Sequence, residues 1–484
     1  MRFFNLFRGI CRFRTRFQPS TKGDTFFYRH SNYLVAALAI SFNLLIPVQL
    51  TAQTSPADWS RVPDILARII PPVFPAQDFV ITNYGAVGNG ASDCTAAFSN
   101  AIAACNGAGG GRVVVPVGTF LTGAIHLRSS VNLYVAQGGK ILFSTDTNAF
   151  LPVVFSRYQG IELMNYSPFI YAYGQTNIAI TGPGTIDGQA QNSVWYNYKS
   201  LLTTDEQTLW NMGSTNLPVA QRVFGLKHYL RPTFIQPVHC QNVLIDGVTL
   251  LNSPMWTVTP LYCTNVTIRG VTVNNSSSSP NTDSCDPDSC SDVLIRNCSF
   301  SDGDDCIAIK SGRDQDGLRV NLPSRNIVIQ NCQFQNGHGG VTLGSEESGG
   351  VTNVFAENCA FNSASLQYVL RLKNNTARGG YIENIYFRNC MTKTVSKTGI
   401  HMTMQYTSSS PADTGSNTPI IRNIDVRDCA FANVAQAIYM QGQASANPIS
   451  DVTVANCRFG NTTSANSFSD TNRISFINNK GGGF

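Results

Sequence analysis

Residues 326–334 read Asn-Ile-Val-Ile-Gln-Asn-Cys-Gln-Phe, and residues 292–300 read Asp-Val-Leu-Ile-Arg-Asn-Cys-Ser-Phe. The shared phrase is Asn or Asp, apolar, any, apolar, any, and then Asn, Asp or Gly. Because its apolar positions alternate with a period of two, each copy predicts a β-strand with one buried face. Further copies start at Asn177, Asn242, Asn265, Asn353, Asn384, Asn423 and Asp451.

The spacing of these copies is typical of a solenoid. From Asn242 onward, successive starts lie 23, 27, 34, 27, 31, 39 and 28 residues apart. A repeat of this length, with one strong strand, weaker strands and turns, fits one coil of a parallel β-helix, in which equivalent side chains stack coil over coil. The sequence therefore predicts an all-β fold, a single-stranded parallel β-helix.

Cysteines follow the same repeat. Of the 14 cysteines, Cys11 precedes the repeats, and six directly follow the last six copies, namely Cys298, Cys332, Cys359, Cys390, Cys429 and Cys457. Five of these six have Phe two residues later, so we expect buried ladders of Cys and of Phe, with the recurrent Asn as a polar ladder at the turns. Cys285, Cys290 and Cys306 fall outside this ladder and are predicted as disulfide candidates. The sequence contains no C-x-x-C pair, so it does not indicate a zinc site.

Three segments are expected along the chain. Residues 1–52 place an Arg-rich stretch before the apolar run LVAALAISFNLLIPV (34–48), which predicts a signal peptide, with an uncleaved anchor as the alternative. Residues 53–77 form a Pro-rich segment, and residues 78–484 form the β-helix domain. Within it, CTAAFSNAIAAC from Cys94 to Cys105 predicts a short N-terminal helix that caps the open end of the coil stack.

The charge of the chain is balanced once the leader is set aside. The formal net charge is +5, but residues 1–52 carry seven Lys and Arg and a single acid, Asp24, which leaves 27 basic and 28 acidic residues beyond them. A near-neutral body does not indicate a nucleic-acid surface. An anionic ligand would therefore be held by local cations.

Acidic residues gather in one stretch, DSCDPDSCSDVLIRNCSFSDGDD, from Asp283 to Asp305. Asp304 and Asp305 are adjacent, so a regular strand would point them to opposite sides unless a bulge or turn intervenes. Asp304 and His338 each lie twelve residues after the start of their repeat, and Asp283 and Arg371 each lie eighteen after theirs. We therefore expect these side chains to line one groove on consecutive coils.

Four short strings occur in order along the chain: Asn281-Thr282-Asp283, Gly303-Asp304-Asp305, Gly337-His338-Gly339 and Arg371-Leu372-Lys373. With ITNYGAVGNGASDCTAAFSNAI (81–102) and NSPMWTVTP (252–260), they resemble the polygalacturonase family, glycoside hydrolase family 28. The resemblance covers nearly the whole chain after the leader. It implies a right-handed single-stranded parallel β-helix that hydrolyses α-1,4-galacturonosyl linkages of polygalacturonate or pectin, with inversion at the anomeric carbon.

The resemblance implies a catalytic role for four residues. Asp304 is expected to be the general acid that protonates the glycosidic oxygen, and Asp283 and Asp305 are expected to activate the attacking water. His338 is expected to tune the protonation of the acid. These residue types suit the chemistry, because glycoside cleavage needs one protonated and one ionised carboxyl at the same pH, and crowded carboxyls retain a proton.

The same resemblance implies substrate contacts. Arg371 and Lys373 are expected to bind galacturonate carboxylates, Arg371 through its planar fork and Lys373 as a point charge. Tyr406, in HMTMQY, and Asn281 are expected to contact the sugar beside the cleavage point.

Some positions depart from the family pattern. Ser284 and Cys285 stand where the family usually has Gly and an apolar residue, and Leu372 replaces the usual Ile. The insertion GRDQDGLRVNLP (312–323) is placed to wall one end of the groove. The strings CDPDSC, GHGG and GSEESGGV resemble the exo-acting bacterial branch and favour release of short units from a chain end.

Alternatives remain open at this level. A pectate lyase-like elimination would use the acidic cluster for calcium, a non-catalytic β-helix would only bind polysaccharide, and the same hydrolysis could act on rhamnogalacturonan or xylogalacturonan. The prediction is a secreted or periplasmic monomer that acts on a pectic polysaccharide. We expect no metal, no cofactor, no nucleic-acid partner and no membrane contact after signal removal.

Overall fold

The structure is a computed structural model of the 484-residue chain and describes residues 58–408, 413–444 and 447–484. The predicted signal peptide, residues 1–52, lies outside the described residues. The described residues form one compact unit. Across the described part of the chain, every helix is too short or too polar to cross a membrane.

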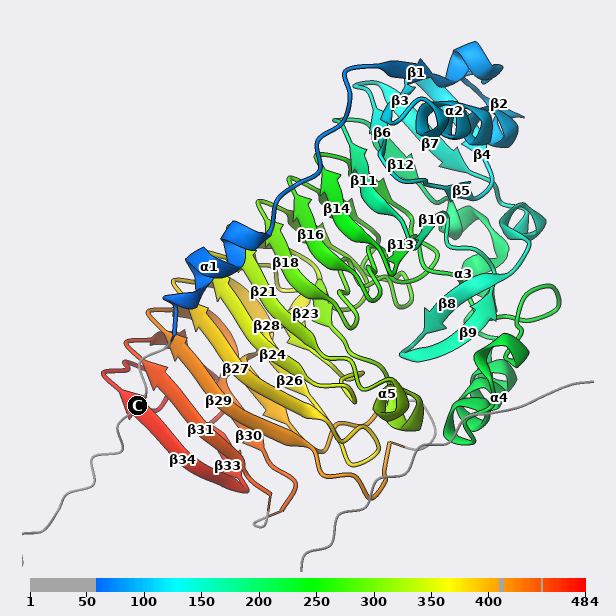
Figure 1. Cartoon of the computed structure of the whole chain (residues 1–484). Helices are drawn as coiled ribbons and strands as arrows, with labels where there is room; N and C mark the ends of the chain where they lie inside the picture. The colour runs from blue at the N-terminus through cyan, green and yellow to red at the C-terminus, as the bar shows by residue number, and fades with distance from the viewer. Residues whose placement is uncertain (1–57, 409–412, 445–446) are drawn as a thin grey trace, which may run out of the picture. The chain divides into compact units, whose positions relative to one another are not determined.

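Equivalent strands of successive coils stack in parallel, which confirms the predicted right-handed parallel β-helix (Figure 1). The first face is a 13-stranded sheet, whose outermost strands are the first and last strands of the described residues. In spatial order its strands are β1 (Asp78–Val80), β3 (Gly111–Val115), β6 (Val131–Val135), β11 (Thr176–Thr181), β14 (Gln241–Asp246), β16 (Thr264–Arg269), β18 (Ser291–Arg296), β21 (Ser324–Gln330), β24 (Val351–Glu357), β27 (Tyr381–Arg388), β29 (Ile420–Arg427), β31 (Ile449–Ala455) and β34 (Thr471–Ile477).

Two further faces complete each coil. The second face contains β2 (Asn89–Asp93), β4 (Gly118–Thr122), β7 (Gly139–Phe143), β12 (Thr185–Asp187), β15 (Thr249–Leu251), β17 (Thr272–Asn274), β19 (Ser299–Ser301), β22 (Gln333–Phe334), β25 (Ala360–Asn362) and β32 (Arg458–Asn461). The third face contains β5 (Ile125–His126), β10 (Ile170–Tyr173), β13 (Ile235–Val238), β20 (Ile307–Ile309), β23 (Gly337–Leu343), β26 (Leu366–Lys373) and β33 (Ser467–Ser469). The long strands β28 (Met391–Thr403) and β30 (Ala430–Gln441) continue through both faces.

The recurrent Asn is explained by backbone geometry at the coil corners. Asn265, Asn326 and Asn353 all have φ of 56°, a left-handed conformation that Asn tolerates better than most residues. Their side chains also bond between coils, since the Asn265 amide donates to Asn242 Oδ1 at 2.6 Å and Asn353 donates to Asn326 Oδ1 at 3.2 Å. The predicted polar ladder at the turns is therefore confirmed.

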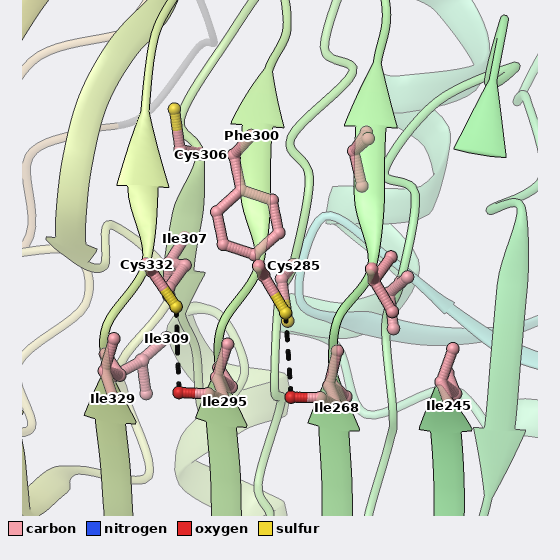
Figure 2. Packing of buried hydrophobic residues seen from close by; sticks show 14 of the residues in the cluster. Ile245, Ile268, Cys285, Ile295, Phe300, Cys306, Ile307, Ile309, Ile329 and Cys332 are labelled. Atoms are coloured by element: carbon pink, nitrogen blue, oxygen red, sulfur yellow. Dashed lines mark hydrogen bonds between the residues drawn. The ribbon is translucent and has the colours of Figure 1, made fainter. Parts of the chain in front are cut away.

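The core lies between the three faces and repeats coil by coil. Ile245, Ile268, Ile295 and Ile329 pair in register on adjacent strands, and each is buried (Figure 2). Burial of one such side chain is worth about 1.5–3 kcal/mol, so the ladder contributes a similar increment at every coil. The predicted Phe ladder is also present: the rings of Phe334 and Phe361 stack with centroids 4.5 Å apart.

All thirteen cysteines of the described residues are free and buried. Thiols of the predicted ladder bond to backbone carbonyls, such as Cys332 to Ile295 at 3.8 Å (Figure 2). The disulfides predicted for Cys285, Cys290 and Cys306 are wrong. These thiols are core residues: the Cys290 thiol donates to the Pro260 carbonyl at 3.1 Å, and burial raises the pKa of the Cys285 and Cys306 thiols well above its usual value.

Two helices cover exposed parts of the stack. Helix α2 (Thr95–Gly107) buries Phe98 and Ile102 against the first coils, as expected of the N-terminal cap. Helix α1 (Arg61–Arg68), within the Pro-rich segment, was not predicted. Its Val62 and Ile65 pack on outward apolar side chains of the first face, and Figure 1 shows it lying across β18 and β21.

Excursions from the coils gather over one end of the third face. The antiparallel hairpin β8 (Val154–Tyr158) and β9 (Ile161–Asn165) leaves the stack after β7. Helices α3 (Val194–Tyr198) and α4 (Thr203–Ser214) lie between β12 and β13, and α5 (Asp314–Val320) is the predicted insertion after β20. Helices α4 and α5 contact each other and β9 (Figure 1).

Candidate active site

The third face carries a cleft of about 570 Å³. All eight residues predicted for catalysis and substrate binding line it: Asn281, Asp283, Asp304, Asp305, His338, Arg371, Lys373 and Tyr406. They come from four successive coils and from the loop after β28. The tertiary structure therefore brings together residues that span 126 positions of the sequence.

Three carboxylates lie at the centre of the cleft. One oxygen from each of Asp283, Asp304 and Asp305 lies within 4.8 Å of the others. Asp304 and Asp305 belong to a bend between β19 and β20, not to a strand. This bend allows both adjacent side chains to face the cleft, which a regular strand would prevent.

Asp304 is the most accessible carboxylate of the three, with 21% of its side chain exposed. His338, on β23 one coil further, lies with Nδ1 2.9 Å from Asp304 Oδ1. The hydrogen bond to Asp304 raises the pKa of His338 above its usual value, although burial opposes this. The amide of Asn281 donates to Asp304 Oδ2 at 3.3 Å. The predicted stacking of Asp304 and His338 in neighbouring coils is thus confirmed.

Asp305 is buried between two cations. Lys373 Nζ lies 2.6 Å from Oδ2, and Arg371 donates to Oδ1 at 3.2 Å. Gly339 lies on the coil between them, and a Cβ there would meet Asp305 Oδ1 at 2.7 Å and Arg371 Cδ at 3.3 Å, so only Gly leaves room. Burial alone would raise the pKa of Asp305, but Lys373 and Arg371 outweigh it and the net direction is downward.

The pKa of Asp283 is shifted in the opposite direction to that of Asp305. Asp283 is 3% exposed, and its Oδ1 has no hydrogen-bond partner among the described residues. Burial and the neighbouring Asp304 raise its pKa well above the usual value, against the opposing effect of Lys310. The surroundings of these two carboxyls therefore move their pKa values in opposite directions, upward for Asp283 and downward for Asp305.

The spacing argument that aligned Arg371 with Asp283 is wrong in its register. The pairing of strands on the third face places Arg371 in line with Thr342 and Ala308, and hence with Asp286. Turn lengths differ between coils, so equal distances from the start of a repeat do not give equal positions on the third face. Arg371 still reaches the cleft because its side chain is long.

Aromatic rings flank the cations. Tyr406 lies 5.1 Å from Lys373 Nζ and 5.8 Å from the Arg371 guanidinium, measured to the ring centroid. The ring of Tyr368 lies beneath Arg371 at 4.5 Å. Such contacts hold a cation in place while leaving its N–H donors free for other partners. Arg371 Nε has no partner among the described residues.

Several residues that line the cleft or contact its lining were missed from the sequence. Arg231, which is buried, donates to Asn281 Oδ1 at 2.7 Å and fixes its orientation. Lys310 lies 3.7 Å from Asp283, and Trp256 and Glu346 contact Lys310. Trp256 belongs to the NSPMWTVTP string, which signalled the family. Glu346 belongs to the string GSEESGGV, but no role was predicted for it, and Arg231 and Lys310 belong to no string or repeat position that marks them.

Comparisons with known proteins agree with this geometry. The sequence model of glycosyl hydrolases family 28 matches residues 105–476. A probable polygalacturonase of Vitis vinifera is 33% identical over 396 residues, 79% of this chain and 74% of the relative. An exo-poly-alpha-D-galacturonosidase of Dickeya chrysanthemi is 27% identical over 395 residues, 75% of this chain and 64% of the relative.

Solved structures give the same result. The crystal structure of a hyperthermoactive exopolygalacturonase from Thermotoga maritima matches with a TM-score of 0.82 and 36% identity, covering 87% of this chain and 96% of that one. The polygalacturonase of Erwinia carotovora ssp. carotovora, at 22% identity and a TM-score of 0.60, shares the fold. On the match over residues 105–476 and on these relatives, the chain belongs to glycosyl hydrolases family 28.

Proposed function

We propose that this protein hydrolyses α-1,4-galacturonosyl linkages of polygalacturonate, the demethylated part of pectin. The observation that carries the proposal is the set of three carboxylates within 4.8 Å, beside Arg371 and Lys373, in one cleft. The relatives named as polygalacturonases support the substrate. The direct test is release of reducing sugar from polygalacturonate, which a non-catalytic binding β-helix would not give.

Asp304 acts as the general acid in this proposal. His338 contacts its Oδ1 and the Asn281 amide donates to its Oδ2, and the exposed part of this carboxyl gives its proton to the glycosidic oxygen. Asp283 and Asp305 orient the attacking water, and Asp305, which stays ionised, accepts its proton. We take inversion at the anomeric carbon from the family resemblance and not from the spacing, because the crowded carboxylates are closer than the roughly 6.5–9.5 Å usual for inverting enzymes. Proton NMR of the first product anomer tests this point.

Arg371 and Lys373 bind the carboxylate of the galacturonate unit next to the cleavage point. Both already contact Asp305, but Lys373 has three donors and Arg371 five, so donors remain for a substrate. Tyr406 packs beside both cations and forms one wall of this subsite. A neutral sugar here would leave two cations without the carboxylate, which favours polygalacturonate over rhamnogalacturonan.

An elimination mechanism with calcium is disfavoured by charge. Asp283, Asp304 and Asp305 are close enough to hold a divalent cation. However, Lys373 and Arg371 already engage both oxygens of Asp305, and each would repel a metal ion at that position. A lyase would form an unsaturated uronide with ultraviolet absorbance, whereas the proposed hydrolase forms reducing ends without it.

We further propose exo action, because the β8–β9 hairpin is bonded to the third face beside the cleft. Arg157 of the β8–β9 hairpin reaches down to Asp288 of the third face at 2.7 Å, and Ser156 donates to Gln236 at 2.7 Å. Gln159 of the same hairpin and Arg313, before α5, line the cleft. The hairpin thus covers the coils over which a longer substrate would extend, and a chain end must stop there.

A time course on polygalacturonate separates exo from endo action. An exo enzyme releases one short product from the first minutes while the viscosity of the polymer falls slowly. An endo enzyme gives a ladder of oligomers and an early loss of viscosity. Secretion through residues 1–52 and action as a monomer belong to the same proposal, tested by N-terminal sequencing of the exported protein and by sedimentation.

A further inference from the structure

Lys310 is a buried lysine inside the cleft that the roles above do not use. It directly follows β20, and only 2% of it is exposed. The ladder places it in line with Gly344 on the next coil and with Lys373 on the coil after that. Gly344 carries no side chain, and a Cβ there would meet Glu347 Oε2 and the Lys373 carbonyl at 2.3 Å. The two lysines therefore approach the carboxylate cluster from different coils.

Three groups fix the Lys310 ammonium. Its Nζ lies 3.1 Å from Glu346 Oε2, 3.7 Å from Asp283 Oδ2 and 4.1 Å from the centre of the Trp256 ring. The contact with Glu346 is a hydrogen bond, whereas that with Asp283 is a charge contact beyond hydrogen-bond length. Trp256 covers the ammonium and limits its hydration, which strengthens both charge interactions.

This arrangement parallels the one at Asp305. Lys373 is the close cation of Asp305, and Lys310 is the corresponding cation of Asp283. We propose that Lys310 is a positioning residue whose ammonium, anchored by Glu346 and Trp256, keeps Asp283 ionisable for activation of the attacking water. The proposal rests on the hydrolytic function proposed above, because it assigns a purpose to the ionised form of Asp283.

Lys310 is poorly suited to bind a substrate carboxylate itself. It already has two anionic neighbours, Glu346 and Asp283, so a third carboxylate would add net repulsion. Arg371, by contrast, retains a donor without a partner among the described residues. Lys310 therefore acts on the reaction through Asp283 and does not need to touch the sugar.

The charges around Asp283 support this role. Burial raises the pKa of Asp283 most strongly, Asp304 and Asp305 add to it, and Lys310 and Lys373 oppose it. Burial would lower the pKa of Lys310, but the surrounding acids outweigh it, and the ammonium stays charged. The charged groups in electrostatic contact with Asp283 from all neighbouring elements are Asp286, Asp302, Asp304, Asp305, Lys310 and Lys373.

The test is the pH dependence of kcat for Lys310→Met on polygalacturonate. Loss of a cation this close raises the pKa of a carboxyl by about 1–3 units, so the acidic limb of the profile moves to higher pH by a similar amount. KM at the pH optimum changes little, because no substrate contact is lost. Lys310→Arg keeps the positive charge, so the acidic limb of its pH profile is expected to lie close to the wild-type position.

Two controls separate this effect from others. Lys397→Met removes a cation that lines the same cleft beside Tyr368, away from Asp283, and is expected to leave the acidic limb in place. The double variant Lys310→Met/Glu346→Gln removes the carboxylate that the single variant leaves unpaired. An unmoved limb in Lys310→Met, or an equal movement in Lys397→Met, overturns the proposal.

A second measurement does not depend on turnover. Infrared difference titration of Lys310→Met, with and without Asp283→Asn, identifies the protonated carboxyl band of Asp283 and its midpoint. A midpoint above the wild-type value supports the role of Lys310, and an unchanged midpoint contradicts it. A wild-type protein that releases no reducing sugar would instead overturn the proposed hydrolytic function, while this titration would still decide whether Lys310 controls Asp283.

Discussion

Replacement of Arg157 by Met tests how the closed end of the cleft is held. Arg157 Nη1 lies 2.7 Å from Asp288 Oδ1, both side chains are at most 1% exposed, and the guanidinium covers the Tyr262 ring at 4.8 Å. Removal of one partner of a buried ion pair typically costs about 3–5 kcal/mol, because the other charge stays buried alone. The cost in Arg157→Met is expected near this range.

The loss should appear locally. In a solenoid each coil contacts its neighbours, so unfolding of the β8–β9 hairpin does not require the distant coils to open. Hydrogen exchange of residues 154–165 is the appropriate assay, with faster exchange expected in Arg157→Met and little change at β29 and β31. The opened end should also release longer products from polygalacturonate.

The double variant Arg157→Met/Asp288→Asn is the matched control. It removes both charges, so most of the lost protection should return if the unpaired Asp288 is the cause. Protection in Arg157→Met within about 1 kcal/mol of wild type would refute the reasoning, because it would mean that the buried pair does not hold the hairpin.

Other predictions follow from single residues. Asp304→Asn should lower kcat by about 10²–10⁴-fold with the fold intact by circular dichroism, and substantial activity would remove Asp304 as the acid. Lys373→Ala should raise KM more for polygalacturonate than for methyl-esterified pectin, and equal effects would reject its carboxylate contact. Burial would raise the pKa of Glu346, but Lys310, Arg378 and Arg313 outweigh it and lower this pKa to about 2. The ionised Glu346 therefore stabilises the fold fully above pH 4.5, and this contribution is lost as the pH falls toward 2. In urea titrations, the free energy of unfolding of Glu346→Gln should decline less steeply than that of the wild type over this pH window. Thiol titration of the mature, unreduced protein in denaturant should find thirteen free thiols, and a lower number would indicate disulfides.

The repeat was readable from the sequence because each coil obeys the same local rules. Asn326 and Asn353 mark corners where the backbone is left-handed, and the alternation between them marks a strand with one buried face. The Cys and Phe ladders were predictable because these residues occur at fixed positions after the copies of the repeat. The disulfide prediction failed because Cys285, Cys290 and Cys306 were judged by their distance from one ladder, whereas all three are free thiols buried in the hydrophobic core.

The site was predictable to a similar extent. The four signature strings identified the three clustered carboxylates, His338, Arg371 and Lys373, all of which line the cleft. Their register was not predictable, because turns of unequal length separate the strands, and Arg371 aligns with Asp286. Lys310 and Arg231 carried no signal, since a lone cation in a sequence does not reveal which carboxyl or amide it faces.

The sequence by itself determined the coil, the direction of its buried side chains and the candidate groups of the site, because these depend on residues close together along the chain. Only the tertiary structure decided which charges surround each carboxyl and how the β8–β9 hairpin is held over the third face. Ionisation of Asp283 and Asp305 depends on burial and on lysines from other coils, and closure depends on Arg157 reaching Asp288 across 131 residues. Electrostatic interactions act through space, so their outcome follows from distances that the order of residues does not contain.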